Sequence, residues 1–276
     1  MSSQSGELTE KELGLELDNM HLRLDAGRGV ARLTLDNPEK MNRVSMEMRD
    51  QISDLFRTLE RDGRARVVVI SGAGEQAFTA GGDIAAFMKS SQGKLSFLHE
   101  NVAAPERFPG PVIAAIDGYC FGVGIELALT CDFRVATSKS KFALPEIGLG
   151  MIPGSGGTQR VARLAGLTRA KDMIMRGRRI SAEEAYEWGL ITEVTEPGEL
   201  DTAVDGLVEE MLARPRLALE TAKRVLNLGQ DTPVETALQL EGYAYGMLRG
   251  TENFAEGVHA FGQKRAPEFR EDGGTS

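Results

Sequence analysis

Two glutamates, Glu126 and Glu146, have sequence surroundings that favour acid–base chemistry. Each is flanked by apolar residues and glycine, and no lysine or arginine lies within four positions of either one. Burial of a carboxylate without a neighbouring cation disfavours its charged form and raises its pKa. Two such groups can exchange protons near neutral pH, as general acid and base catalysis requires. A single glutamate in this setting is more often an ordinary residue that reaches water, so the interpretation depends on what else accompanies the pair.

Two glycine-rich turns accompany the glutamates. Ala80-Gly81-Gly82-Asp83 precedes a stretch compatible with a helix, and Gly122-Val123-Gly124 precedes the apolar segment that carries Glu126. Glycine lets the backbone approach a ligand closely, and free N–H groups at such a junction bind negative charge. Two such donors that converge on one oxygen would form an oxyanion hole. One glycine-rich turn indicates only a turn, and it is the order and spacing of the whole set that make it specific.

Alternating strands and helices must position these residues. Ser45 is expected to cap a helix whose apolar residues recur on one face, and Ser181 with Glu184 forms a capping-box signature for a later, short helix. Continuous apolar runs predict strands that are buried on both faces, whereas an alternating pattern predicts a strand with one covered face. The predicted strands are residues 31–35, 67–70, 112–116, 134–136 and 141–143.

The motifs, taken in this order, resemble the crotonase superfamily and most closely its enoyl-CoA hydratases. The similarity covers about residues 20–269 and is carried by residues 36–42, 77–84, 118–126, 145–146 and 152–160. It implies an α/β crotonase fold, in which repeated ββα units form a spiral core, with a C-terminal helical oligomerisation region. The corresponding parts of this chain are an N-terminal extension (1–18), the core with the active site (19–198) and the helical region (199–276).

The resemblance also implies roles for individual residues. The backbone N–H groups of Gly82 and Val123 match the oxyanion-hole donors for a thioester carbonyl. Glu126 and Glu146 match the two carboxylates that add water across an α,β double bond, with Glu146 expected to protonate the α-carbon. The positions that match coenzyme A contacts are Lys40, Met41, Ala80, Asp83, Ile84, Phe261 and Lys264.

Three of these assignments need a qualification. Phe261 and Lys264 match a pair that reaches the coenzyme A of a neighbouring subunit, but helix packing and a solvated terminal charge are the ordinary roles of such residues. Many hydratases of the resembled family have glycine where this chain has Val123. The backbone donor survives that change, and the valine side chain must find room beside the acyl group.

Composition and charge limit the possible partners. The net charge of −9 over 276 residues opposes nucleic-acid binding. Two cysteines and three scattered histidines predict neither a disulfide framework nor a metal site, and the lack of an apolar run of eighteen residues predicts no membrane span. Residues 1–18 are acidic and have no basic leader before an apolar core, unlike an export signal. We therefore expect a cytoplasmic protein whose partner is an acyl-CoA thioester, with no cofactor beyond the coenzyme A of the substrate.

The two ends of the chain leave structural alternatives open. Thr9 with Glu12 could cap a short helix, and disorder of the N-terminal extension is equally compatible with the sequence. From Glu199 onward the apolar spacing is helical, and packing between helices is its simplest explanation. In the resembled family this region packs against neighbouring subunits, which predicts a homotrimer or a hexamer made of two trimers.

Three functions remain open on the sequence alone. A 2-enoyl-CoA hydratase is favoured, because both glutamates are present. A second possibility is another crotonase reaction, such as double-bond isomerisation or the hydrolysis or cleavage of a C–C bond; isomerases of the family typically manage with the Glu146 position alone. The third, a non-catalytic or RNA-associated homologue, is disfavoured by the acidic charge balance and the intact acid–base pair.

Overall fold

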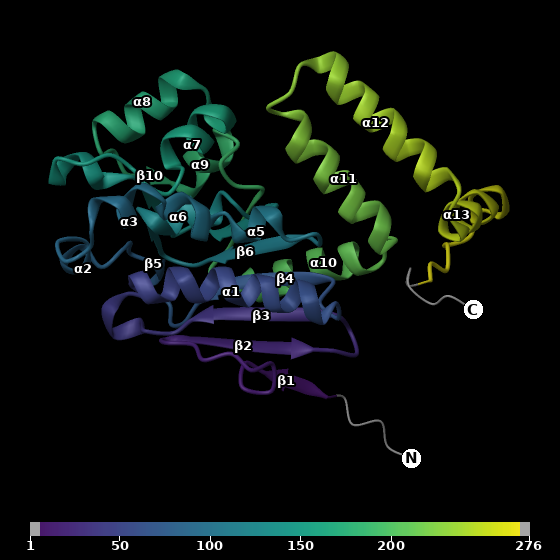
Figure 1. The fold of residues 1–276 in the computed structure, drawn as a ribbon, viewed down its shortest axis with the longest axis horizontal. Coiled ribbons are helices and arrows are strands. Elements are labelled where there is room, and N and C mark those ends of the chain that lie inside the picture. The colour runs from purple at the N-terminus through teal and green to yellow at the C-terminus, as the bar shows by residue number, and fades with distance from the viewer. Residues whose placement is uncertain (1–5, 271–276) are drawn as a thin grey trace. The chain divides into compact units, whose positions relative to one another are not determined.

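The computed structural model describes residues 6–270 and divides the chain into two compact units (Figure 1). The first unit runs to Phe108 and continues over Val112–Gly206, and the second comprises Pro109–Pro111 and the chain from Leu207 onward. All of the strands belong to the first unit. The second unit is helical, as the sequence predicts for the C-terminal region.

Two sheets form the framework of the first unit. The larger has the order β1 (Glu7–Thr9), β2 (Met20–Asp25), β3 (Val30–Leu35), β4 (Val67–Gly72), β6 (Val112–Ile116), β8 (Phe133–Thr137), β11 (Glu193–Thr195). The smaller has the order β10 (Ile180–Ser181), β9 (Lys141–Ala143), β7 (Tyr119–Phe121), β5 (Ala77–Thr79). Neighbouring strands are parallel from β3 to β11 and from β5 to β9, whereas β1, β2 and β10 pair in the antiparallel sense. The five strands predicted from the sequence are all present, as β3, β4, β6, β8 and β9.

Each of three strands in the larger sheet is followed directly by a strand of the smaller one: β4 by β5, β6 by β7 and β8 by β9. Every pair leads into a helical segment, first α2 (Ile84–Phe87), then α6 (Val123–Ala128), then the 3-10 helix η2 (Pro145–Leu149). This succession is the predicted repetition of ββα units. As a result, the ends of β5, β7 and β9 deliver the two glycine-rich turns and both glutamates to one edge of the smaller sheet.

Burial explains why these segments are strands. All five residues of β6 are buried, as are the first four of β4, so both of their faces are covered. Strands of parallel sheets in α/β proteins have this character because helices lie on both faces of the sheet. The apolar runs that predicted these strands therefore correspond to the centre of the core.

The longest helix of the first unit, α1 (Met46–Asp62), also follows the prediction. Ser45 is its N-cap, and its hydroxyl accepts a hydrogen bond from the backbone N–H of Met48 at 3.1 Å. The buried face carries the predicted apolar residues and, unexpectedly, Arg49. Besides α1, α2, α6 and η2, the described helices of this unit are η1 (Pro38–Lys40), α3 (Gln92–Ser96), α4 (Leu98–Val102), α5 (Ala104–Arg107), α7 (Gly157–Ala165), α8 (Leu167–Met175) and the capping-box helix α9 (Ala182–Glu187). The helix α10 (Leu200–Leu212) begins in this unit and ends in the second.

The described part of the N-terminal segment forms neither the capped helix nor the disordered extension that the sequence left open. Residues 7–9 form β1, which pairs with β2. The expected contact between Thr9 and Glu12 exists, with Thr9 N donating to Glu12 Oε2 at 2.8 Å, but it closes a turn and caps no helix. Pairing with the sheet edge satisfies backbone groups that a helix start would have left free. Residues 1–5 of the predicted extension lie outside the described part of the chain.

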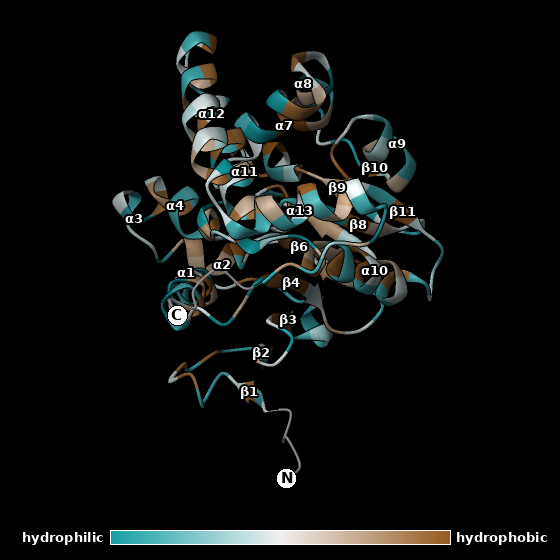
Figure 2. Cartoon of the chain, turned by 90° about the vertical axis from the view of Figure 1, so that its right-hand side faces the viewer, coloured by the Kyte–Doolittle hydropathy of each residue, from teal (hydrophilic) through white to brown (hydrophobic). Residues whose placement is uncertain are grey.

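The second unit contains α11 (Arg216–Gly229), α12 (Val234–Arg249) and α13 (Glu252–Gln263). Apolar residues recur along α11 and α12 (Figure 2), yet neither helix has a buried residue in the part of the chain that the structure describes. The two helices contact each other, as expected from these apolar stripes, but in the single chain this packing leaves their side chains only partly covered.

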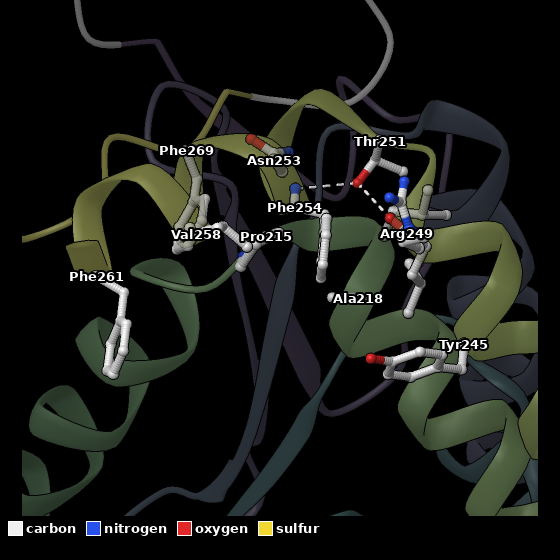
Figure 3. A pocket seen from close by; sticks show the side chains of 13 residues that line it. Pro215, Ala218, Tyr245, Arg249, Thr251, Asn253, Phe254, Val258, Phe261 and Phe269 are labelled. Atoms are coloured by element: carbon white, nitrogen blue, oxygen red, sulfur yellow. Dashed lines mark hydrogen bonds between the residues drawn. The ribbon is translucent and has the colours of Figure 1, made fainter.

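A cavity of about 450 Å³ lies within the second unit (Figure 3). It is bordered by the start of α11, the end of α12 and α13, and most of its lining side chains are apolar, including Phe254, Phe261 and Phe269. None of the helices in the described residues has the length and hydropathy needed to cross a membrane.

Candidate active site

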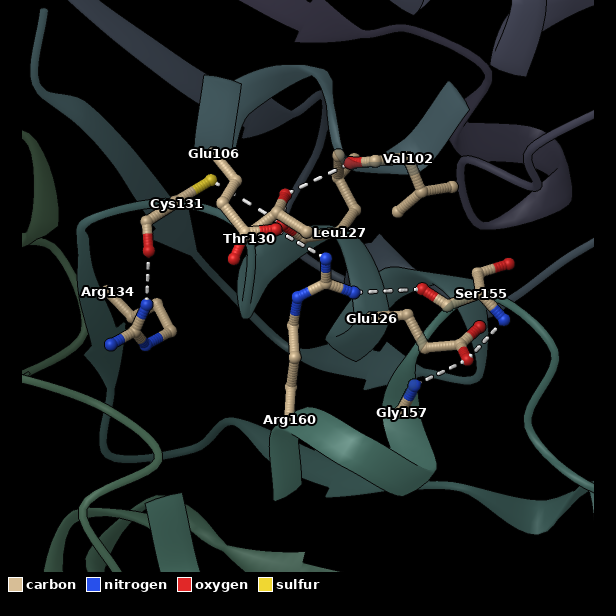
Figure 4. Close-up of polar contacts among 10 residues, drawn as sticks. All are labelled: Val102, Glu106, Glu126, Leu127, Thr130, Cys131, Arg134, Ser155, Gly157 and Arg160. Carbon is tan, nitrogen blue, oxygen red and sulfur yellow. Dashed lines mark hydrogen bonds and ion pairs between the residues drawn. The ribbon is translucent and has the colours of Figure 1, made fainter. Parts of the chain in front are cut away.

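Glu126 is fixed by backbone donors from a distant segment. It lies on α6 and is 2% exposed. Its Oε1 atom accepts hydrogen bonds from Ser155 N at 2.7 Å and from Gly157 N at 2.9 Å (Figure 4). A Cβ atom on Gly157 would lie 3.1 Å from both Cγ and Oε1 of Glu126, so only glycine permits this approach without a shift. These two bonds use one carboxylate oxygen and leave Oε2 as the oxygen that could take a proton.

Glu146 lies in η2 in a different environment. Its Oε2 atom is buried and has no hydrogen-bond partner among the described residues. Burial raises the pKa of Glu146 to about 7, and the negative charge of Glu126 adds to the increase. A hydrogen bond from its own backbone and the positive charge of Arg49 oppose it. A carboxyl group with this pKa holds or releases its proton near neutral pH, as a general acid must.

The two glycine-rich turns lie against each other. Gly122 has a φ of 53°, and a Cβ atom on it would lie 3.7 Å from Gly81 Cα and 3.0 Å from Glu146 Oε1. The first turn is held by Val44, whose N–H donates to Gly81 O at 3.0 Å and whose carbonyl accepts from Asp83 N at 3.1 Å. Glycine at position 122 thus permits both this left-handed backbone conformation and the close approach of Glu146.

The two predicted oxyanion donors lie on these turns. Val123 is the first residue of α6, and Gly82 lies between the two backbone bonds made by Val44. Within the part of the chain that the structure describes, neither Gly82 N–H nor Val123 N–H donates a hydrogen bond. The Val123 side chain is buried and belongs to the hydrophobic core.

Arg49 is the site residue that the sequence reasoning missed. It is 3% exposed, and its Nη1 donates to Ser155 Oγ at 2.7 Å. Burial lowers the pKa of Arg49, while the negative charges of Glu126, Asp50 and Glu146 oppose the decrease. The glutamates have no cationic neighbour along the sequence, but the folded chain places Arg49 near both of them. The premise that no cation accompanies them is therefore wrong for the folded protein. Helical spacing carries the signal, because Arg49 lies three residues before Ile52 and thus on the apolar face of α1.

The residues predicted to contact coenzyme A fall into two groups. Five lie in the first unit around the Gly82 turn, where Ala80 N donates to Met41 O at 2.9 Å and Asp83 caps α2. Ile84 is 53% exposed there. Phe261 and Lys264 lie in the second unit, where the Phe261 side chain is 87% exposed and borders the apolar cavity. Lys264 ends α13 with a left-handed backbone conformation.

A family model described as enoyl-CoA hydratase/isomerase matches residues 25–272. The chain belongs to the enoyl-CoA hydratase/isomerase family. The match spans both compact units, so the C-terminal helices are part of the family pattern. Among the described residues, no group of three or more histidine, cysteine, aspartate or glutamate side chains could hold a metal ion.

Relatives within the enoyl-CoA hydratase/isomerase family cover nearly the whole chain. The crotonyl-CoA hydratase of Syntrophomonas wolfei is 36% identical over 251 residues, which are 89% of this chain and 96% of that protein. The carnitinyl-CoA dehydratase of Salmonella arizonae is 35% identical and covers 90% of this chain and 98% of its own length. The crystal structure of an enoyl-CoA hydratase from Bacillus anthracis superimposes with a TM-score of 0.83 at 35% identity, covering 88% of this chain and 96% of that one. The chain is thus an enzyme of the crotonase family with the crotonase fold.

Proposed function

We propose that this enzyme is an enoyl-CoA hydratase, which adds water across the α,β double bond of a 2-enoyl-CoA thioester to give a 3-hydroxyacyl-CoA. The observation that carries the proposal is the pairing of two carboxyl groups in unlike environments. Glu126 accepts two backbone hydrogen bonds on one oxygen, whereas burial raises the pKa of Glu146 to about 7. Two neighbouring carboxyl groups with different environments can divide the roles of base and acid.

In the proposed reaction Glu126 acts as the base. Its carboxylate takes a proton from water while the water oxygen forms a bond to the β-carbon. The electrons of the double bond move toward the thioester carbonyl, and Glu146 gives its proton to the α-carbon as the carbonyl re-forms. One water molecule is added, Glu126 ends protonated and Glu146 ends ionised. Proton exchange with solvent then restores both groups.

The negative charge that develops on the thioester oxygen needs donors that are in place before the reaction. Gly82 N–H and Val123 N–H support this role, since both lie on abutting turns and neither donates elsewhere in the described residues. Donors aimed at developing charge stabilise the transition state more than the substrate, and loss of one typically costs on the order of 10²–10³ in rate.

The coenzyme A part of the substrate is proposed to contact Lys40, Met41, Ala80, Asp83 and Ile84 of one subunit. Phe261 and Lys264 would serve the coenzyme A of a neighbouring subunit in a trimer or a pair of trimers. The exposed Phe261 side chain supports this assignment, because a large apolar ring at 87% exposure is suited to a contact outside its own chain. No cofactor or metal takes part in the proposed reaction.

The proposal is tested by following the absorbance of the conjugated enoyl thioester. Purified enzyme is added to crotonyl-CoA and to longer 2-enoyl-CoAs, alongside the variants Glu126→Gln and Glu146→Gln. We expect rapid loss of absorbance with the wild-type enzyme and a decrease of at least about 10³-fold in kcat for either variant, because each removes a proton-transfer group. Glu47→Gln, an exposed glutamate on α1, is the matched control and should retain full activity.

The outcome separates hydration from the other reactions of the family. Loss of absorbance that survives both substitutions would remove the glutamates from the mechanism. Absence of any change with the wild-type enzyme, although the thioesters bind, would direct the assignment to double-bond isomerisation or C–C bond cleavage.

A further inference from the structure

One cation lies at the centre of the candidate site without an assigned role. Arg49 lies on the buried face of α1, far in sequence from both glutamates, and its charge interacts with Glu126 and Glu146 together. Arginine is seldom fully buried unless it is paired. Its burial at this position therefore calls for a reason beyond packing.

We propose that Arg49 is a positioning residue of the acid–base pair, which holds Glu126 in place through Ser155 and sets, through its charge, the pH at which Glu146 releases its proton. The inference rests on the proposed hydratase function for the roles of the two glutamates. Arg49 acts through Ser155 and through its charge, and its hydrogen bond among the described residues goes to Ser155 rather than to either glutamate.

The first observation is a chain of hydrogen bonds. Arg49 Nη1 donates to Ser155 Oγ at 2.7 Å, and the backbone N–H of Ser155 donates to Glu126 Oε1 at 2.7 Å. Ser155 is itself only 1% exposed, and both its hydroxyl and its backbone N–H are engaged in these contacts. A guanidinium–hydroxyl bond in a buried setting is stronger than a neutral one. Arg49 therefore fixes the loop that holds the base.

The second observation is the contact with the opposite turn. A Cβ atom on Gly82 would lie 3.4 Å from Arg49 Nη2 and 2.9 Å from Phe87 Cζ. The guanidinium also lies over the Phe87 ring, with Cζ 5.6 Å from its centroid. A planar cation held on an aromatic face has little freedom to leave. One side chain thus touches both the turn of a predicted oxyanion donor and the loop that binds Glu126.

Three carboxyl groups from three different elements interact with the charge of Arg49. Glu126 on α6, Glu146 in η2 and Asp50 on α1 itself all interact with the guanidinium. Asp50 is engaged elsewhere, since Lys94 Nζ lies 3.5 Å from its Oδ2. Arg160, the other nearby cation, bonds to Ser155 O at 3.2 Å and pairs with Glu106. Glu126 and Glu146 are therefore the carboxyl groups of the candidate site whose charges interact with Arg49.

The test separates the charge of Arg49 from its hydrogen bond. Arg49→Gln removes the charge and keeps an N–H donor on a shorter side chain, and Arg49→Lys retains the charge without the planar fork. Loss of a cation beside carboxylates raises their pKa. Hydration needs Glu146 protonated, so the alkaline limb of the kcat/KM profile, where Glu146 loses its proton, moves to higher pH when the Arg49 charge is removed. We expect Arg49→Gln to shift this limb upward by about one pH unit, and the optimum with it.

The shift has a signature that a structural defect lacks. The ratio of Arg49→Gln to wild-type kcat/KM should rise with pH, by up to about tenfold between pH 6 and pH 9, because Glu146 keeps its proton to higher pH in the variant. Arg49→Lys should lose kcat at every pH and keep the wild-type optimum. Arg57→Met, which removes an exposed cation from the same helix, is the control and should match the wild type. A folded Arg49→Gln variant whose profile has the wild-type optimum would overturn the proposal.

A readout without catalysis keeps the two proposals apart. The infrared carbonyl band of protonated Glu146, identified by its absence in Glu146→Gln, should titrate near pH 7 in the wild type and at higher pH in Arg49→Gln. An enzyme that hydrates no enoyl-CoA would refute the proposed function, and this titration would still decide the influence of Arg49 on Glu146. Arg49→Met replaces Arg49→Gln if the latter does not fold, and an unshifted titration in either variant would refute the inference.

Discussion

Two glutamates of the same chemical type have become unlike groups because different backbone segments surround them. Glu126 receives two N–H donors at the start of α7, while Glu146 has a buried oxygen without a partner among the described residues. A buried carboxyl group without a hydrogen bond is costly to ionise. The property that suits Glu146 to acid catalysis should therefore also reduce the stability of the folded enzyme at high pH.

The pH dependence of stability tests this cost. The pKa of Glu146 is about 7 in the folded enzyme, against 4.5 for an unperturbed glutamate. The folded state thus binds this proton more tightly, and the free energy of unfolding falls as pH rises from about 4.5 to about 7. Glu146→Gln removes that dependence. The free energy of unfolding of the variant, measured by thermal unfolding, should therefore rise relative to that of the wild type by about 2 kcal/mol between pH 5 and pH 8. A constant difference over this range, as expected for the control Glu47→Gln, would contradict the assigned environment.

Of the individual site residues, Glu126 and Glu146 could be predicted from the sequence, whereas Arg49 could not. The apolar and glycine residues around Glu126 and Glu146 indicated burial from their immediate neighbours alone. Arg49 is followed by Asp50 and sits in a helix rich in charges, where it resembles a solvated side chain. Its contact with Ser155 joins segments that no local pattern relates, so only the folded chain brings them together.

At the scale of elements, α6 and β5 are packed too closely for a side chain at Gly124. A Cβ atom there would lie 2.7 Å from Thr79 Cγ2 and 2.9 Å from Thr79 O. Thr79 is fully buried, and its hydroxyl accepts a hydrogen bond from Gly81 N at 3.1 Å. The packing of α6 on β5 thus fixes the position of Val123 N–H relative to the turn that carries Gly82.

Gly124→Ala should disturb this contact. The added methyl group meets backbone as well as side chain, so we expect a loss of about 1–3 kcal/mol in unfolding free energy, measured by chemical denaturation, together with reduced kcat. Gly206→Ala provides the matched control, because Gly206 is an exposed position in α10 where an added Cβ atom would meet no neighbour within 4 Å among the described residues. Alanine there should stabilise the helix by up to about 1 kcal/mol. If both substitutions changed the free energy of unfolding equally, the α6–β5 contact would accommodate a methyl group without strain.

Elements with a strong local pattern were predicted from the sequence, and those that depend on pairing were not. β4 and β6 are continuous apolar runs, and α1 has both a cap and an apolar face, so each of these specifies its own structure. β1 has no such pattern: it exists because the edge of β2 accepts it. The smaller sheet has strands of only two or three residues, and its order follows from the larger sheet rather than from local sequence.

At the scale of the whole molecule, the second unit exposes apolar surface that is typical of a protein–protein interface. Neither α11 nor α12 buries a residue in the described chain, and large apolar side chains such as Leu226, Val234 and Tyr243 are largely exposed. Exposed apolar surface of this kind marks sites of protein association. It supports the expected trimer or hexamer, whose subunits would cover these helices.

Tyr243→Asp tests the assembly. A charge placed at a covered apolar position costs several kcal/mol unless it is paired, so we expect the mass measured by light scattering to fall toward that of one chain. Met88→Asp introduces the same charge at an even more exposed apolar residue of the first unit and should leave the assembly intact. An unchanged mass for Tyr243→Asp would place the subunit contacts on another surface.

The position of β11 has a consequence for the order in which the protein is made. β11 pairs with β8 through Val135, Ala136 and Thr137, and it covers the outer edge of the larger sheet. Every residue proposed to act on the acyl group has left the ribosome before this strand has been synthesised. The nascent chain therefore carries all of these residues beside an unpaired strand edge, which is the kind of feature that drives aggregation. A chain whose synthesis stops between η2 and β11 would contain all the residues proposed to act on the acyl group, but its strand β8 would have one unpaired edge.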